Sequence, residues 1–129
     1  MTGDLTDEEL DFLLSTFDLA RDGEVAGLVE SLDAGLPVNL TNSSGDTYLI
    51  LAAYHRHPEL VRTLLERGAD HARVNDNGQT ALAAAVFRQR GDIVTMLLRA
   101  GADPELGPRS AVAIGEFFDL PEMLALLRA

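Results

Sequence analysis

The sequence predicts an all-α fold in which helix-turn-helix units stack side by side into a solenoid. The main observation is a repeat, because Gly35, Gly68 and Gly101 are each separated by 33 residues. When residues 45–70 are aligned with residues 78–103, ten of the 26 positions are identical, where unrelated sequences would share roughly two. Each unit also contains two short apolar segments at helical spacing, separated by turn-forming residues. A period of this length is typical of repeat proteins whose units stack on one another.

Each unit is expected to form two short helices and an extended loop. Thr47 and Thr80 can cap the first helix, because a hydroxyl accepts a hydrogen bond from a free amide at a helix start. The second helix carries apolar pairs four residues apart, and Gly68 and Gly101 follow its last pair. Glycine there can take the left-handed conformation that ends a helix. The loops, rich in Asn, Asp, Gly and Ser, are predicted to be hairpin-like and span residues 36–46 and 69–79.

The N-terminal region is predicted to form an acidic helix that covers the first repeat. Thr6 and Glu9 have the spacing of a capping box. The acidic segment from Asp4 to Glu9 is interpreted mainly as a helix start and a solubility cap, and the alternative is that it recruits a basic partner. The apolar residues that follow at helical spacing are Leu10, Leu13, Leu14 and Phe17.

Two stretches of the chain carry a resemblance to a known repeat family. They are Gly45-Asp46-Thr47-x-Leu49-x-x-Ala52-Ala53 with Glu59-Leu60-Val61-x-x-Leu64-Leu65-x-x-Gly68-Ala69-Asp70, and Gly78-Gln79-Thr80-x-Leu82 through Gly101-Ala102-Asp103. These stretches resemble ankyrin repeats. The resemblance implies one all-α ankyrin-repeat domain over residues 1–129, similar to the short stand-alone ankyrin proteins of bacteria. About four repeats are expected, with a truncated last one, at 5–41, 42–74, 75–107 and 108–129.

The sequence departs from the family pattern at two places. The usual Thr-Pro-Leu-His at the start of the first helix is Thr-Tyr-Leu-Ile, then Thr-Ala-Leu-Ala, then Ser-Ala-Val-Ala. The histidine hydrogen bonds that join repeats in the family are therefore expected to be absent, with apolar packing in their place. The glycine usually found between the two helices is replaced by Arg56 and Gln89, so a distorted turn is expected there.

Composition excludes several classes of function. A net charge of −11 makes nucleic-acid binding unfavourable, and the absence of cysteine excludes disulfides and thiolate chemistry. The longest apolar runs are seven residues, too short to span a membrane. The first twenty residues carry six acidic side chains and no basic one, unlike a signal peptide. A monomeric cytoplasmic protein is therefore expected.

No residues suggest catalysis, a metal or a cofactor. His55 and His57 lie near a turn where alternate side chains diverge, and His71 lies in the next loop, so a three-ligand metal site is not predicted. Ser43 and Ser44 are interpreted as ordinary turn residues rather than as a nucleophile site. Lysine is absent, and no phosphate-binding loop motif occurs. We therefore predict no enzymatic activity.

The resemblance implies a non-catalytic protein-protein interaction module, a small intracellular adaptor or regulator. It would bind a protein, with a basic partner favoured by the acidic charge, through its loop tips and the concave face of its first helices. The alternatives are an inhibitor or immunity-type protein that masks a basic enzyme, a hydrolase and a nucleic-acid binder. The family positions that contact partners correspond to Ser43, Ser44, Asp46, Tyr54, His55, Asp76, Asn77, Gln79, Phe87 and Arg88.

Three aromatic residues occupy equivalent places in successive first helices. Stacking of the repeats should set Tyr54, Phe87 and Phe117 in a row. Large rings that lose little rotamer entropy are typical anchors of protein interfaces. Alternatively, the rings pack sideways and seal the stack. We favour the interface for Tyr54 and Phe87 and packing for Phe117.

Overall fold

The computed structural model describes residues 5–129, so Asp4 of the acidic segment lies outside the described residues. Over this range the chain forms eight α-helices in four antiparallel pairs, joined by turns and loops. The pairs are α1 (Asp7–Asp22) with α2 (Val25–Asp33), α3 (Tyr48–Tyr54) with α4 (Pro58–Glu66), α5 (Ala81–Phe87) with α6 (Gly91–Arg99), and α7 (Ala111–Phe117) with α8 (Pro121–Leu127).

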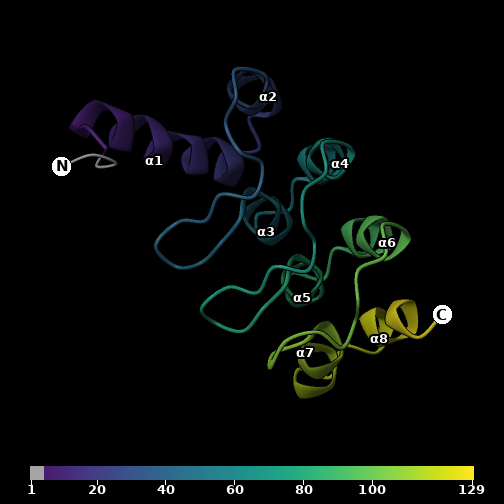
Figure 1. Cartoon of the computed structure of the whole chain (residues 1–129). Helices are drawn as coiled ribbons and strands as arrows, with labels where there is room; N and C mark the ends of the chain where they lie inside the picture. The colour runs from purple at the N-terminus through teal and green to yellow at the C-terminus, as the bar shows by residue number, and fades with distance from the viewer. Residues whose placement is uncertain (1–4) are drawn as a thin grey trace.

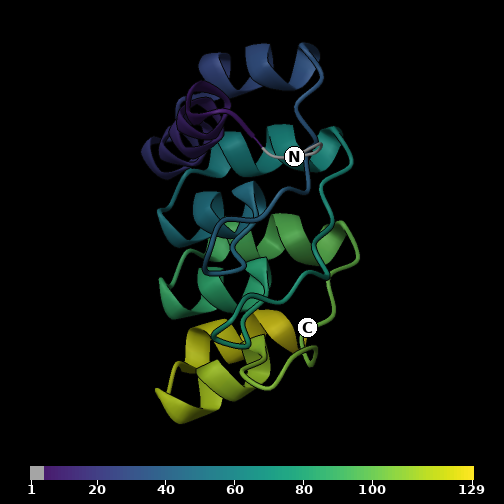
Figure 2. The ribbon, with the colours of Figure 1, turned by 60° about the vertical axis from the view of Figure 1, so that its left-hand side comes forward.

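The four pairs stack in chain order to form a two-layered solenoid. The inner helices pack in the order α1, α3, α5, α7, and the outer helices in the order α2, α4, α6, α8 (Figures 1 and 2). The loops between pairs project to the side of the inner helices, where we call them fingers: finger 1 spans residues 36–46 and finger 2 spans residues 69–79. Together with the inner helices they form one face of the molecule.

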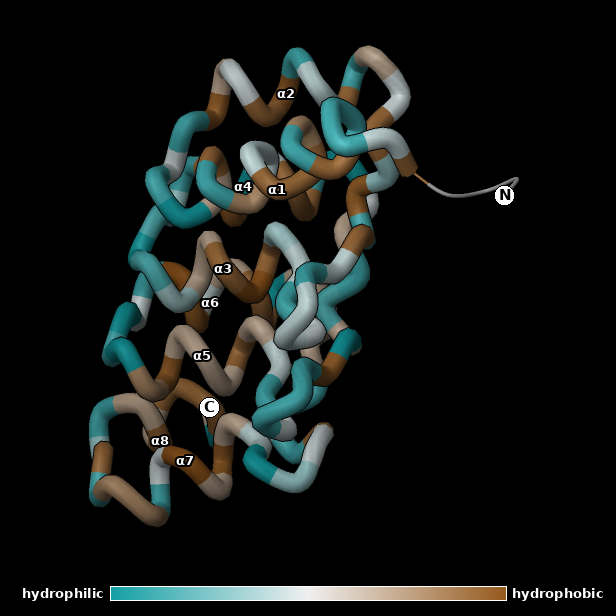
Figure 3. The backbone as a smooth tube through the Cα atoms, turned by 90° about the vertical axis from the view of Figure 1, so that its left-hand side faces the viewer, coloured by the Kyte–Doolittle hydropathy of each residue, from teal (hydrophilic) through white to brown (hydrophobic). Residues whose placement is uncertain are grey.

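The hydrophobic core follows from the apolar pattern of each layer. In α3 and α5, six of the seven residues are buried, because each helix is enclosed by its own outer helix and by the inner helices on both sides. The outer helices bury one stripe only, as Leu60, Val61 and Leu64 show in α4. Figure 3 shows apolar residues concentrated on the inner helices and hydrophilic residues in the fingers. Such short helices depend on this packing for their stability.

The predicted helix caps are present at both ends. Thr47 Oγ1 accepts a hydrogen bond from the Ile50 amide at 3.1 Å, and Thr80 Oγ1 accepts one from the Ala83 amide at 3.2 Å. At the other end of the helix pair, Gly68 and Gly101 have φ of 83° and 98°. Both are therefore in the left-handed region, as predicted.

The turn between the two helices of a pair keeps one conformation whichever residue occupies it. Gly23 has φ of 70°, and the residues at equivalent places, Arg56, Gln89 and Asp119, have φ of 66°, 58° and 52°. The prediction of a distorted turn at Arg56 and Gln89 is therefore wrong. Packing of the two helices fixes the turn, and the side chain accepts the cost of a left-handed backbone.

The prediction that the N-terminal helix covers the first repeat is wrong. Helix α1 is itself the inner helix of that repeat. Its C-terminal half packs on α3, and its N-terminal half projects beyond the stack (Figure 1). Phe17 is buried, but Leu10 and Leu14 of the predicted apolar stripe are exposed. The predicted capping box is present, with Thr6 and Glu9 each accepting a hydrogen bond from the other's amide.

A buried hydrogen bond joins α1 to α3 where apolar packing alone was expected. The Tyr48 hydroxyl lies 2.8 Å from Thr16 Oγ1, and Thr16 also donates to the Leu13 carbonyl. The Tyr48 ring stacks on Phe17 with centroids 4.7 Å apart. Tyr48 occupies the place of the family's proline, so this departure supplies part of the connection between repeats.

Candidate functional site

The fingers are stiffened by their own asparagine side chains. Asn42 Oδ1 accepts hydrogen bonds from the amides of Ser44 and Asp46, both at 3.0 Å. Asn75 repeats this arrangement one unit later, accepting from the amides of Asn77 at 3.0 Å and Gln79 at 2.9 Å. The predicted hairpin-like loops are therefore tight turns closed by asparagine.

Each finger is also bonded to the next. The Asp76 amide donates to the Ser44 carbonyl at 3.0 Å, and Asn75 Nδ2 donates to Asp46 Oδ1 at 2.8 Å. The Arg109 amide donates to the carbonyl of Gly78 at 3.0 Å. Part of the polar surface that the sequence assigned to a partner is thus used to hold the fingers together.

Four aromatic rings form a continuous row, which we call the aromatic ladder, made of Tyr54, Phe87, Phe118 and Phe117. Tyr54 and Phe87 stack with centroids 6.2 Å apart. Phe118 meets Phe87 edge-on at 5.4 Å and Phe117 at 4.9 Å. The sequence predicted Tyr54, Phe87 and Phe117 as consecutive members, but Phe118 stands between the last two.

The preference for Phe117 as a packing residue is wrong, because its side chain is 82% exposed. Phe87 and Phe118 are 38% and 49% exposed, and Tyr54 is half-buried. The exposure rises toward the C-terminal end because, among the helices of residues 5–129, α7 is the last inner helix of the stack. The ladder therefore offers aromatic surface to solvent along three inner helices.

A cation lies on the ladder. Arg88, the residue after α5, places its guanidinium carbon 4.8 Å from the centre of the Tyr54 ring of the preceding repeat. Phe118 stands at the equivalent place after α7 and contacts Phe87 of its own preceding repeat. The residue that ends one inner helix thus packs on the last aromatic residue of the helix before it.

Two adjacent hollows lie between the fingers and the aromatic ladder, and together we call them the finger groove. The larger, of about 610 Å³, is lined by ladder residues, by finger 2 and by Pro108, Arg109 and Ile114. The smaller, of about 280 Å³, is lined by both fingers and by Arg21 of α1. The two share Tyr54, so they form a continuous surface.

The groove brings together most of the predicted site residues. Tyr54, Asn77 and Gln79 line both hollows. Phe87 lines the larger one, and the smaller one is lined by Ser44, Asp46 and His55. Asp76 lines a separate hollow under the tip of finger 2, whereas Ser43 and Arg88 line none of these.

Sequence reasoning missed several residues of the groove. Arg21 and Phe118 line the groove but were not among the predicted contact residues. Pro108 and Arg109 belong to the shortened last loop, which brings them against Gly78. The equivalence of Arg21 with Tyr54, 33 residues later, and of Phe118 with Arg88 could have identified these two.

The polar residues of the groove are not arranged for nucleophilic catalysis. Ser44, Asp46 and His55 line one hollow, yet no hydrogen bond joins any two of them, whereas a catalytic triad needs both links. His57 instead donates to the Arg21 carbonyl at 2.6 Å, which holds the turn. Within residues 5–129, no group of three or more His, Asp or Glu side chains is arranged to hold a metal. The described helices include none of the length and apolarity needed to cross a bilayer.

Burial and charge lower the pKa of His55. Burial is the larger cause, and the positive charges of His57, Arg21 and Arg88 act in the same direction. Asp22 opposes them. The surroundings of His55 are therefore positive on balance.

This fold and surface define a class: helical repeat solenoids whose loops and inner helices form a contact face. The model of the family "Ankyrin repeats (3 copies)" matches residues 17–107, and the chain belongs to that family. A protein of Pseudomonas aeruginosa named for its ankyrin repeats is 47% identical over 55 residues, which is 43% of this chain and 32% of the relative. Acyl-CoA-binding domain-containing protein 2 of Arabidopsis thaliana is 39% identical over 51 residues, which is 40% of this chain and 14% of the relative. The chain therefore matches a third or less of each relative's length.

Proposed function

We propose that the chain is a non-catalytic protein-binding module, a small intracellular adaptor or regulator that holds its partner in the finger groove. Ankyrin repeats are in general protein-protein interaction modules, and the family is typically non-catalytic. The observation that supports this site is the aromatic ladder, whose rings are left exposed beside the fingers. An aromatic residue used for apolar packing alone would be buried, as Phe17 is.

The contact would combine apolar and polar elements in the way protein interfaces do. The rings of Tyr54, Phe87 and Phe118 would supply buried area at the centre. Asn77 and Gln79 at the edge of finger 2 would supply hydrogen bonds to the partner's backbone or side chains. The finger tips add Ser43, Ser44, Asp46 and Asp76, with His55 and Arg88 at the α3 and α5 ends.

The test is affinity capture from the source cell, comparing the wild type with a Tyr54→Ala, Phe87→Ala double variant. Truncating two central anchors should weaken partner binding by about tenfold or more. Phe12→Ala is the matched control, because Phe12 is an exposed aromatic residue outside the groove. Partners that are retained by the double variant as well as by the control would contradict the proposal, provided that both variants melt as the wild type does.

A further inference from the structure

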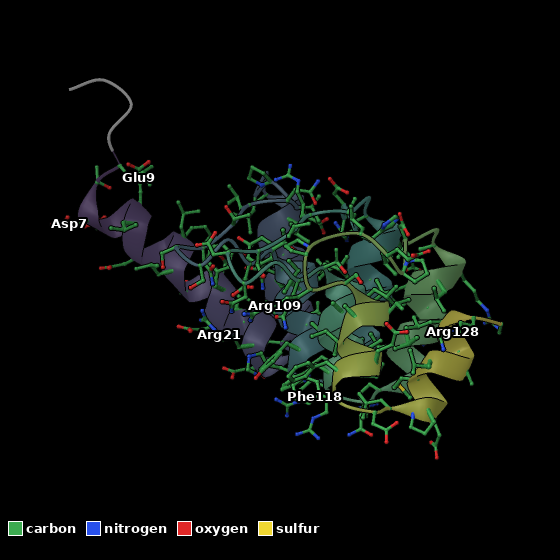
Figure 4. The ribbon with its side chains drawn as sticks, turned by 90° about the horizontal axis from the view of Figure 1, so that it is seen from below. Asp7, Glu9, Arg21, Arg109, Phe118 and Arg128 are labelled. Atoms are coloured by element: carbon green, nitrogen blue, oxygen red, sulfur yellow. The ribbon has the colours of Figure 1, made fainter. Side chains whose placement is uncertain are left out.

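The finger groove carries a local positive charge in a protein whose net charge is −11. Arg109 lines the larger hollow and Arg21 lines the smaller one, while Arg88 lies over the ring of Tyr54, which lines both. Figure 4, which looks along the stack from below, shows Arg21 and Arg109 on the same flank as Phe118, with Arg128 on the far side. Each of the three arginines therefore lies beside at least one ring of the aromatic ladder.

Two of these arginines have no acidic partner in the part of the chain that the structure describes. Arg88 and Arg109 form no ion pair, whereas Arg21 pairs with Asp18 at 2.8 Å. Asp46 is the one carboxylate that lines either hollow between residues 5 and 129, and it accepts a hydrogen bond from Asn75. Among the described residues, Arg88 and Arg109 are thus cations without an ion pair beside the ladder, and Asp76, the other acidic residue near Arg109, lines the separate hollow under finger 2 with it.

The environment of His55 supports the same sign of potential. The cations around this imidazole, which include Arg21 and Arg88, outnumber the single acidic side chain Asp22 that opposes them. This positive potential lies at the end of the groove opposite Arg109. Positively charged side chains are therefore present at both ends of the groove rather than at one residue alone.

Exposed rings and free guanidinium groups together specify the occupant. The rings require apolar or aromatic side chains to cover them, and the guanidinium groups prefer carboxylates, with which they form paired hydrogen bonds. We infer that the finger groove binds an acidic peptide segment that also carries apolar side chains, presented by another protein. This inference rests on the proposed function and specifies its partner.

The inference reverses the expectation from net charge, which favoured a basic partner. Charges more than about 10 Å away are largely screened at physiological salt, so the acidic residues in the projecting first turns of α1 act weakly on the groove, whereas Asp18 and Asp22 of the same helix lie close to Arg21 and His55. Contacts inside the groove are screened much less. Specificity for an acidic segment therefore depends on the nearby arginines.

The experiment is selection from a random displayed peptide library on the wild-type protein, followed by affinity measurements on the enriched peptides. Enriched sequences should combine Asp or Glu with Leu, Phe or Trp. An Arg88→Glu, Arg109→Glu variant should bind them at least about tenfold more weakly, which corresponds to about 1.4 kcal/mol. An Arg62→Glu, Arg99→Glu variant is the matched control, because both residues are exposed on outer helices and lack an ion pair among the described residues.

The outcomes separate this inference from the proposed function. Enriched peptides that are neutral or basic, and that bind the Phe87→Ala variant more weakly than the wild type, would overturn the inference and leave the proposed function standing. If no enriched peptide loses affinity in the Phe87→Ala variant, both the inference and the proposed function are contradicted. Equal losses in the two charge-reversed variants would also overturn it, because general charge and not the groove would then decide. Sedimentation without peptide tests whether a second copy of the chain occupies the groove. Self-association of the wild type that is lost in the Arg88→Glu, Arg109→Glu variant would assign the groove to a second copy and overturn the inference.

Discussion

The hydroxyl of Tyr48 lies 2.8 Å from Thr16 Oγ1, and both side chains are completely removed from solvent. Because the Thr16 hydroxyl donates to the Leu13 carbonyl, the Tyr48 hydroxyl is the donor in this pair. The two residues belong to α3 and α1, so the bond connects the first repeat to the second. It is a polar connection inside a layer that is otherwise apolar.

Tyr48→Phe should reduce the free energy of unfolding by about 1 kcal/mol, the usual net value of a buried hydrogen bond. The ring and its stacking on Phe17 are retained, so the loss reports the hydroxyl alone. Urea denaturation of Tyr48→Phe, Thr16→Val and the double variant measures it. A double variant whose loss equals the sum of the two single losses would show that the hydroxyls do not interact.

The same residue should make stability depend on pH above about 10. Burial raises the pKa of Tyr48 above its ordinary value of 10.0, against a smaller lowering by the Thr16 hydrogen bond. The unfolded chain therefore loses this proton first, so the contribution is complete below pH 10 and is lost as pH rises through the raised pKa. Lysine and cysteine, whose side chains titrate near this range, are absent from the chain.

Urea denaturation between about pH 8 and about pH 11 checks this second prediction. Tyr48→Phe should make the free energy of unfolding nearly independent of pH there. Tyr54→Phe is the control and should retain the decline of the wild type. A decline that persists in Tyr48→Phe would show that burial of Tyr48 is not its source.

Gln89→Gly should stabilise the protein by up to about 1 kcal/mol. Gln89 is exposed and has φ of 58°, a conformation that costs a residue with a Cβ roughly 1–2 kcal/mol. Glycine relieves this strain but loses more conformational entropy on folding, which offsets part of the gain. The change in melting temperature measures the effect. A lower melting temperature would mean that the Gln89 side chain makes a favourable contact that outweighs the strain.

Gly23→Ala should be more destabilising than Gly68→Ala. Both glycines have positive φ, but a Cβ at Gly23 would lie 2.5 Å from Nδ1 of His57, while a Cβ at Gly68 would meet nothing within 4 Å. Backbone strain alone predicts about 1 kcal/mol at Gly68. At Gly23, displacement of His57 also breaks its bond to the Arg21 carbonyl. Equal decreases in melting temperature for the two variants would show that the His57 side chain moves away from the new Cβ at little cost.

The start of α1 should loosen in acid. Hydrogen bonds from Thr6, chiefly from its backbone amide, lower the pKa of Glu9 below its ordinary value of 4.5. The cap is therefore complete above pH 4.5 and is lost as pH falls through the lowered pKa of Glu9. Protection of the amides in the first turns of α1, measured as the exchange rate relative to the intrinsic rate at each pH, should fall over that range, and Glu9→Gln should remove most of the fall. Because these turns project from the stack, global unfolding should hardly change.

The repeat, the helix caps and the terminal glycines could be predicted because they depend on residues close together in sequence. Thr47 caps a helix three residues away, and Gly68 needs only the helix before it. The insertion of Phe118 into the aromatic ladder could not be predicted, because it depends on which rotamer a neighbouring repeat leaves free. The positive groove was missed for a related reason: Arg21, Arg88 and Arg109 are far apart in sequence, and counting charges along the chain does not reveal it.

The hydrogen bonds between fingers have a further consequence for how the protein meets its partner. Since the amides of Asp76 and Arg109 are bonded to the finger before, one finger cannot swing without pulling on the next. The fingers therefore behave as one stiff plate, already shaped before any encounter, and little conformational entropy is left to lose when a partner binds. Loop tips are ordinarily the most mobile part of a protein. Here the hydrogen bonds between successive loops hold the tips in place, so the partner segment must adapt its conformation to the groove.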